Sequence, residues 1–189
     1  MSRKKRSRKR IVYPPLIFLI GATLVYALYA CTFGFDPNQP PPSGSTGGSG
    51  STGGELAQVT RVVDGDTIDV RLSGGTIEAV RYIGMNTPER DETCYSEAKQ
   101  ANAIFVEGKT VRLVKDVSDR DIYGRLLRYV YVDNLFVNRA LVEQGYAEVV
   151  SYPPDNAHYD EFLRLEQEAA AARRGCHPSG IFNDGSFTR

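Results

Sequence analysis

The chain has 189 residues, of which 41% are hydrophobic, and its 23 basic side chains equal its 23 acidic ones in number. This length suits one globular domain with extensions and excludes two domains of typical size. Seven basic residues lie within the first ten, so the rest of the chain has 16 basic and 23 acidic side chains. A nucleic-acid partner would therefore meet a locally basic site on an acidic body.

The N-terminal part has the pattern of a membrane anchor. Residues 1–10 form a basic tail, and residues 11–30 follow without any charge. Twenty helical residues reach about 30 Å, the thickness of a bilayer core. The basic flank predicts a cytoplasmic tail and an extracytoplasmic domain. We expect a single-pass signal anchor in the cell membrane. The alternatives are a cleaved signal peptide with a secreted domain, and a lipoprotein anchored at Cys31.

A linker is predicted at residues 31–54. From residue 36 onwards it is Pro-rich and then Gly/Ser/Thr-rich, with no apolar side chain to bury, which is typical of a flexible spacer. The folded domain is expected at residues 55–189, a length that supports an independent core.

The domain begins with β-structure. Five segments have the composition or the apolar–polar alternation of strands, and they are residues 57–63, 67–72, 77–83, 110–114 and 126–132. The third and fourth of these segments are separated by a predicted helix at residues 95–107, with Gly108 in the C-cap position.

Two further helices are predicted near the C-terminus. Asn138 can cap a helix over residues 139–144 that ends at Gly145. A last helix would open at Asp155 and Asn156, end at Gly175, and bury one face made of Phe162, Leu165, Ala169 and Ala172. Strands followed by a few short helices indicate an α+β fold, and five strands with a helix after the third match a small Greek-key barrel of the OB type.

Four short clusters bear residues suited to phosphate and metal chemistry: DGDT at 64–67, Arg81, NTPE at 86–89 and DIYGR at 121–125. Each alone has an ordinary explanation, since Asp-Gly forms turns and Thr-Pro-Glu opens helices. In this order, and followed by FVNRALVEQG at 136–145, they resemble the thermonuclease (staphylococcal nuclease-like) family from about residue 59 to 174. The resemblance implies an OB-fold five-stranded β-barrel with three helices.

The resemblance also implies calcium-dependent hydrolysis of phosphodiester bonds in DNA and RNA, with little sequence specificity. By resemblance, Arg81 and Arg125 hold the phosphate, which suits the bidentate and permanently charged guanidinium. Glu89 is the general base or positions the attacking water. Single-stranded or unstructured nucleic acid is the favoured substrate, and no protein partner is evident.

The same resemblance implies a calcium site and a nucleotide pocket. Asp66 supplies the main metal carboxylate, with the Asn86 side chain and the Thr87 carbonyl as further oxygen ligands for a hard cation. Many relatives have Asp where this chain has Asn86, so we expect weaker Ca²⁺ binding. Tyr123 can hydrogen-bond phosphate or stack on a base, and Tyr152 aligns with the nucleotide pocket, with packing on its own prolines as the alternative.

Two other positions leave alternatives open. Ile122 stands where the staphylococcal pattern has Lys, which puts one contact to a terminal phosphate in doubt. Asp64 is close to the metal ligands in the family pattern and could act through water, but turn formation explains it equally well.

Cys94 and Cys176 lie at predicted helix ends in an exported domain, so a disulfide between them is expected, with two unrelated thiols as the alternative. No spacing typical of a zinc site is present, and His158, at the start of the last helix, is expected to be a structural surface residue. Two readings of function follow. The first is a membrane-tethered calcium-dependent nuclease, held through residues 11–30. The alternative is a non-catalytic OB-fold module that binds nucleic acid or protein at the cell envelope.

Overall fold

The computed structural model of the protein describes residues 53–183. The predicted tail, membrane segment and linker lie outside the described residues, apart from Gly53 and Gly54, and stay predictions. Within residues 53–183, no helix has both the length and the apolar composition that a bilayer crossing requires.

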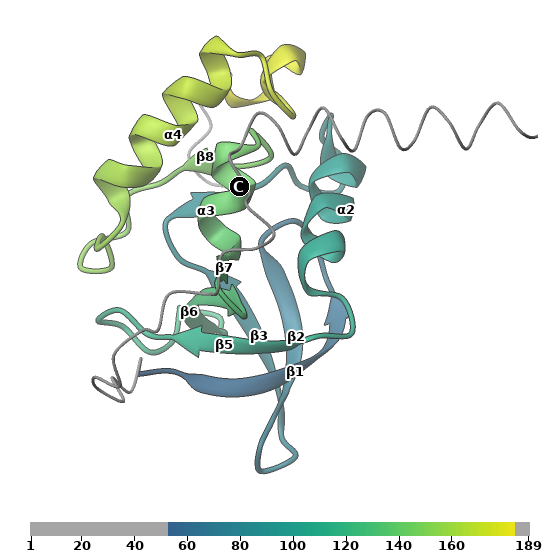
Figure 1. The fold of residues 1–189 in the computed structure, drawn as a ribbon, viewed down its shortest axis with the longest axis vertical. Helices are drawn as coiled ribbons and strands as arrows, with labels where there is room; N and C mark the ends of the chain where they lie inside the picture. Colours follow the sequence, from purple (N-terminus) through teal and green to yellow (C-terminus); the bar gives the residue numbers. More distant parts are fainter. Residues whose placement is uncertain (1–52, 184–189) are drawn as a thin grey trace, which may run out of the picture. The chain divides into compact units, whose positions relative to one another are not determined.

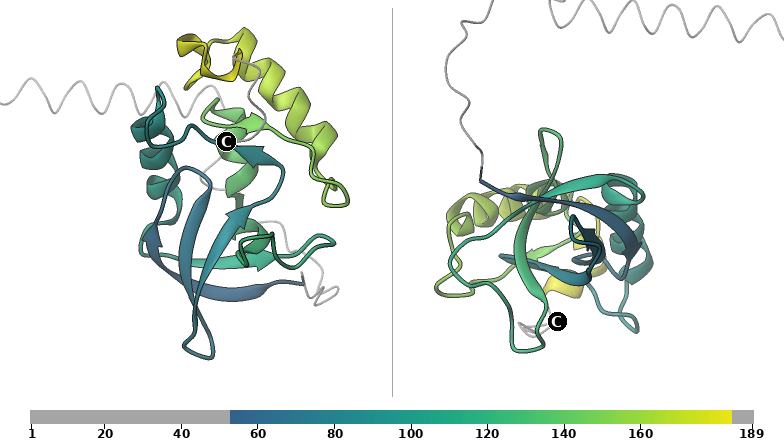
Figure 2. Two further views of the ribbon diagram at one scale, coloured as in Figure 1. Left: turned by 180° about the vertical axis from the view of Figure 1, so that it is seen from behind. Right: turned by 90° about the horizontal axis from the view of Figure 1, so that it is seen from below.

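Five strands close into a barrel (Figure 1, Figure 2). They are β1 (Glu55–Val62), β2 (Thr67–Leu72), β3 (Ile77–Tyr82), β5 (Thr110–Val114) and β6 (Leu126–Val132). The pairs β1–β2, β2–β3, β1–β5 and β5–β6 are antiparallel, and a parallel pairing of β3 with β6 closes the barrel. The predicted α+β fold with an OB-type barrel is confirmed, and each predicted strand matches an observed one within two residues.

Alternation along the strands fills the barrel with branched apolar side chains. Nine of them are buried and belong to one core: Val59, Val62, Ile68, Val70, Val80, Val111, Leu113, Leu126 and Val130. Each such burial stabilises the fold by about 1.5–3 kcal/mol. This core gives the loops at the barrel rim a rigid base.

Three short strands were not predicted: β4 (Met85–Asn86), β7 (Leu135–Phe136) and β8 (Glu148–Val149). Strands of two residues show no alternation, so the sequence gives no period to detect. The antiparallel β4–β8 pair places Asn86 opposite Glu148. This pairing fixes the backbone of a predicted site residue.

Three helices cover one end of the barrel, with α3 between α2 and α4 (Figure 1). They are α2 (Tyr95–Val106), α3 (Val137–Glu143) and α4 (Tyr159–Ala171), and two 3₁₀ turns follow, η1 (His177–Ser179) and η2 (Ile181–Asn183). The α2 prediction is confirmed, and Gly108 has the positive φ of 66° expected just beyond a helix end.

The predicted start of α3 was wrong. Asn138 lies inside the helix, fully buried, and makes no cap bond. Its Oδ1 accepts the Val130 amide at 2.9 Å, and its Nδ2 donates to the Ile83 carbonyl at 3.1 Å. It therefore joins α3 to the barrel instead of capping a helix.

The predicted ends of α4 were also wrong. The helix begins after His158, and Asp155 and Asn156 belong to the preceding loop. It ends at Ala171, and both Arg173, with φ of 54°, and Gly175, with φ of 51°, take the left-handed conformation beyond that end. Phe162, Leu165 and Ala169 are buried as predicted, whereas Ala172 is exposed. His158 packs edge-on against Tyr129, with ring centroids 4.7 Å apart, so it belongs to an aromatic cluster.

The expected disulfide joins Cys94 and Cys176, whose Cα atoms are 5.7 Å apart. It ties the start of α2 to the segment after α4. Nearby, a Cβ on Gly175 would lie 2.5 Å from the Gly145 carbonyl oxygen, and the Cys176 amide donates to that oxygen at 2.8 Å. Gly145 does end α3 as predicted, but Gly175 is required for this close contact.

Candidate active site

Asp66 lies in the turn between β1 and β2, but its side chain points away from the turn. The amides of Val63 and Asp64 donate to the Thr67 carbonyl, at 3.0 and 3.2 Å, and close the turn through the backbone. The Asp64 carboxylate accepts the Asp66 amide at 3.2 Å, which is the ordinary behaviour of Asp in a turn. The Asp66 carboxylate does not take part in closing the turn, and it contacts residues of two other segments.

Position 65 has to be glycine because the segment that contains Thr87 packs closely against it. A Cβ on Gly65 would lie 2.6 Å from the Thr87 hydroxyl oxygen and 2.7 Å from Thr87 Cβ. Because glycine leaves this space open, Thr87 reaches Asp66, and its amide and hydroxyl donate to Oδ2 at 2.9 and 3.1 Å. The Asp-Gly pair therefore serves a tertiary contact as well as a turn.

Arg81 lies beside Asp66 because it pairs with Thr67 in the β2–β3 ladder. Its Nη1 is 2.5 Å from Asp66 Oδ2, as an ion pair without hydrogen-bond alignment. Its Nη2 donates to the Oδ1 atom of Asn86. Arg81 and Asp66 are both buried, so removal of one would leave the other charge uncompensated, at a cost of about 3–5 kcal/mol.

Asn86 and Thr87 form the buried wall behind this ion pair. Asn86 is 0% exposed and Thr87 is 2% exposed. Within residues 53–183, the Asn86 Nδ2 atom has no hydrogen-bond partner. The Asn86 oxygen is directed at Arg81, and any cation that uses this oxygen has to share it with, or take it from, the guanidinium.

The two carboxyl groups of the DGDT turn differ in their electrostatics. Burial, and after it the charge of Asp66, raises the pKa of Asp64 to about 6, although Arg81 opposes this shift. A carboxyl group near that value is partly protonated in weak acid. Asp66 differs in that its carboxylate contacts the Arg81 guanidinium directly, at 2.5 Å.

Arg125 is held at the other side of the site by Asp121. One Asp121 oxygen accepts the amides of Tyr123 and Arg125, both at 2.9 Å, and the other accepts Arg125 Nε at 2.6 Å. The Arg125 guanidinium carbon lies 5.4 Å from the centroid of the Tyr123 ring. Tyr123 is 77% exposed and its neighbour Ile122 is 92% exposed, so the loop offers an aromatic and an aliphatic side chain to an incoming ligand.

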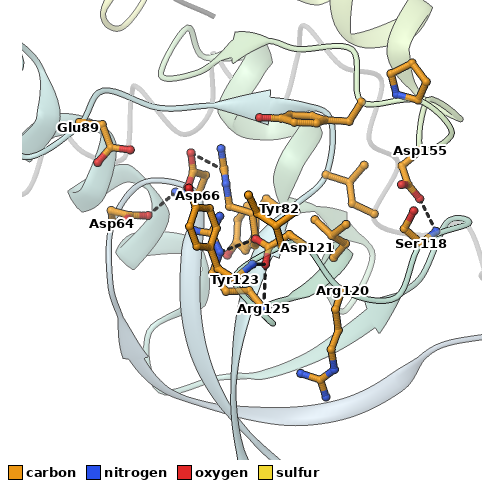
Figure 3. A pocket seen from close by; sticks show the side chains of 16 residues that line it. Asp64, Asp66, Tyr82, Glu89, Ser118, Arg120, Asp121, Tyr123, Arg125 and Asp155 are labelled. Atoms are coloured by element: carbon orange, nitrogen blue, oxygen red, sulfur yellow. Dashed lines mark hydrogen bonds and ion pairs between the residues drawn. The ribbon is translucent and has the colours of Figure 1, made fainter. Parts of the chain in front are cut away.

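Glu89 lies in the segment that follows β4. Its amide donates to the Glu92 carboxylate at 2.8 Å, in a turn that precedes α2 by several residues. The Thr-Pro-Glu motif therefore does not open a helix here. The side chain is exposed, and Figure 3 shows it on the same side of the pocket as Asp64 and Asp66.

One pocket of about 830 Å³ brings these groups together (Figure 3). Six of the eight predicted site residues line it: Asp66, Arg81, Glu89, Tyr123, Arg125 and Tyr152. The other two, Asn86 and Thr87, touch it only through Asp66 and Arg81. The volume suits a nucleotide-sized ligand.

The sequence did not predict all of the residues that line the pocket. Ser118, Arg120 and Asp155 also face the pocket. Arg120 donates to both oxygens of Glu78, at 2.8 and 3.1 Å. Asp155 had been assigned to a helix start, and nothing in its local sequence indicates the loop that it contacts. Only a family pattern that includes the loop could have shown these roles.

A closed five-stranded barrel with three arginines and several carboxylates in one rim pocket defines an OB-fold protein with an anion-directed site. The family described as "Staphylococcal nuclease homologue" matches residues 79–177, a span that includes most of β3, the whole of β5 and β6, all three helices and most pocket residues. The chain belongs to this family.

Named relatives agree with that assignment. The chain is 31% identical to a thermonuclease of Staphylococcus hyicus over 165 residues, which are 84% of this chain and 91% of the relative. It is 41% identical to the SPbeta prophage-derived endonuclease YokF of Bacillus subtilis over 129 residues, 63% of this chain and 43% of the relative. It is also 41% identical to the endonuclease YncB of the same organism, over 61% of this chain and 59% of the relative. The chain thus spans about half the length of these two endonucleases.

Proposed function

We propose that this protein is a nuclease that hydrolyses phosphodiester bonds of DNA and RNA with little sequence specificity. The observation that supports it best is the presence of Arg81, Glu89 and Arg125 around one pocket. Two arginines can grip the non-bridging oxygens of a phosphate and stabilise the charge that develops there. Glu89, whose carboxylate is exposed to the pocket, can take a proton from a water or orient it for attack.

Single strands fit the pocket better than duplexes do. The rim side chains Tyr123 and Tyr152 are 77% and 45% exposed. Aromatic rings in such positions stack on unpaired bases without regard to sequence, at about 1–3 kcal/mol per base. This supports single-stranded or unstructured nucleic acid as the substrate.

We further propose that the reaction depends on Ca²⁺. The Asp66 carboxylate, the Asn86 amide oxygen and the Thr87 carbonyl are all hard oxygen donors, which suit this ion. Within residues 53–183, no three His, Cys, Asp or Glu side chains gather around a possible ion, so backbone and amide oxygens have to complete the site. When bound, the ion would relieve negative charge at the phosphate.

The decisive assay uses purified protein and single-stranded DNA, with Ca²⁺ or with a chelator. We expect calcium-dependent cleavage that Glu89→Gln lowers by about 10²–10³-fold. Asp91→Asn is the matched control, because Asp91 is an exposed acid close by that does not line the pocket. Binding of the oligonucleotide without any cleavage would instead support the non-catalytic OB-fold module.

We also propose that the domain is held at the extracytoplasmic face of the cell membrane through residues 11–30. The uncharged stretch and its basic flank support an anchor, and the Cys94–Cys176 disulfide suits an oxidising compartment. Protease added to intact cells should release the domain at the linker. Complete protection would contradict this orientation, and release without protease would point to the secreted alternative.

A further inference from the structure

Two loops contribute side chains to the wall of the pocket. The first loop, residues 115–125, connects β5 to β6 and presents Tyr123 and Arg125. The second loop, residues 150–158, connects β8 to α4 and presents Tyr152. The two loops are far apart in sequence, so contacts between them determine how far apart these side chains lie.

Asp155 of the second loop binds the first loop directly. Its Oδ1 atom accepts the amides of Val117 and Ser118, at 2.9 and 2.7 Å, and Figure 3 shows the bond from Ser118. Asp155 is only 3% exposed. Burial alone would raise the pKa of the Asp155 carboxyl, but the bonds from Ser118 and Val117 outweigh it and hold the pKa below its usual value. This carboxylate is thus matched to two backbone donors.

Asp116 of the first loop makes a second contact between the two loops. Its Oδ2 atom accepts the Ala157 amide of the second loop, at 3.1 Å, and the Tyr129 hydroxyl at the same distance. Tyr129 is a buried residue of β6. We call Asp116 and Asp155, with the amides that they accept, the carboxylate clasp. It joins the loops at two points and fastens them to the barrel.

In each loop, short hydrogen-bonded segments link the clasp to a side chain that faces the pocket. In the second loop, the Asp155 amide donates to the Tyr152 carbonyl at 2.6 Å, and the Asn156 side chain accepts the Tyr152 amide at 2.9 Å. In the first loop, Asp121 fixes the amides of Tyr123 and Arg125. A change at Asp155 is therefore transmitted to both aromatic side chains through short, bonded segments.

Direct contact of Asp155 with substrate is disfavoured by charge, because a carboxylate repels a phosphate. We propose that Asp155 is a positioning residue that, through the carboxylate clasp, sets the separation of Tyr123 and Tyr152 and so governs the affinity of the pocket for a nucleic-acid strand. This inference rests on the proposed nuclease function for its substrate, but the clasp itself can be measured without turnover.

Asp155→Ala should raise KM for a single-stranded oligonucleotide about tenfold, the effect of losing order in two rim side chains, and leave kcat within about twofold. Asp155→Asn should restore KM, because both amides bond to a single oxygen that an Asn side chain also provides. Hydrogen exchange should show that the amides of residues 117 and 118 lose protection in the Ala variant and keep it in the Asn variant. Val111→Ala is the stability control, since Val111 is a buried β5 residue away from the pocket, and it should lower Tm without raising KM.

An unchanged KM in an Asp155→Ala variant whose amides have lost protection would overturn the proposal. So would an Asp155→Asn variant as impaired as Asp155→Ala. If Asp155→Ala does not fold, Asp116→Ala removes the opposite contact and should give the same rise in KM. If the wild-type protein binds oligonucleotide but cleaves none, the nuclease function fails, and the dissociation constants of the same variants then decide the clasp alone.

Discussion

Asn86→Asp is the most informative single change at the candidate calcium site. Asn86 is fully buried, its oxygen accepts a bond from Arg81, and its Nδ2 has no partner within the described residues. The change replaces that unpartnered donor, which costs about 1–3 kcal/mol, with a second charged oxygen. The cluster then has two carboxylates, on Asp66 and at position 86, facing a single guanidinium.

The sign and size of the effect follow from these charges. In the present cluster, Asp66 and Arg81 cancel, so an arriving cation meets no net negative charge from this pair. A second carboxylate attracts each unit of cationic charge 4 Å away by about 4 kcal/mol at an effective dielectric constant of 20. Burial of the new carboxylate costs free energy, and its pairing with Arg81 weakens its attraction for the cation, so most of this binding energy is offset. We expect a net gain of about 1.5–3 kcal/mol, or about a 10–100-fold lower dissociation constant for Ca²⁺.

Calcium titration by calorimetry measures this directly, with the rise in Tm on adding Ca²⁺ as a second reading. Asn134→Asp makes the same chemical change at an exposed position in the β6–β7 turn, and it should leave the affinity unchanged. Asn86→Ala removes the oxygen and should weaken binding. An Asn86→Asp protein that binds Ca²⁺ no more tightly than the wild type would refute the assignment of Asn86 as a ligand and leave Arg81 as its only partner.

Three further outcomes are expected. Ile122→Lys places a cation on a rim side chain that is 92% exposed, and it should tighten binding of a strand with a terminal phosphate and steepen the slope of log affinity against log salt by about 1. Loss of the Cys94–Cys176 disulfide, which spans 82 residues, should lower the free energy of unfolding by about 4 kcal/mol in urea denaturation. Glu166 has a pKa raised by burial, despite a bond from the Val149 amide. Its ionisation therefore destabilises the folded state as pH rises from the unfolded pKa through the raised folded one. Glu166→Gln should accordingly stabilise the protein at pH 7, with the difference disappearing below the unfolded pKa in thermal denaturation at each pH.

The elements that repeat along the sequence were predictable. Alternation in β2 and in the middle of β1, at Ala57 and Val59, marks which side chains enter the barrel, and those side chains are buried. The two-residue strands β4, β7 and β8 were not predictable, because two residues show no alternation, and β4 and β8 form only through pairing between distant segments. Loops whose residues show no periodic pattern take their conformation from contacts between distant segments.

Short polar side chains gave the clearest errors, and for one reason. Asn138 and Asp155 are both residue types that cap helices, and each precedes a helical pattern. Asn138 instead bonds Val130 and Ile83, and Asp155 bonds Val117 and Ser118. A cap bond and a tertiary bond use the same atoms, so the local sequence does not distinguish them. The site motifs placed Asp66, Arg81 and Glu89 at one pocket, but they did not indicate that Arg81 binds Asn86.

The acidic balance of the domain has a counterpart in the pocket. Each pocket arginine is already paired with a carboxylate of the protein: Arg81 with Asp66, Arg125 with Asp121, and Arg120 with Glu78. These carboxylates orient the guanidinium groups before a ligand arrives, which lowers the entropy cost of binding. They also reduce the net attraction for phosphate, so a strand gains affinity mainly where Arg81 or Arg125 can bond phosphate while keeping its carboxylate partner. A site of this kind would select a correctly placed phosphate over general polyanion attraction, which reconciles the proposed nuclease function with a chain that has 16 basic and 23 acidic residues beyond its first ten.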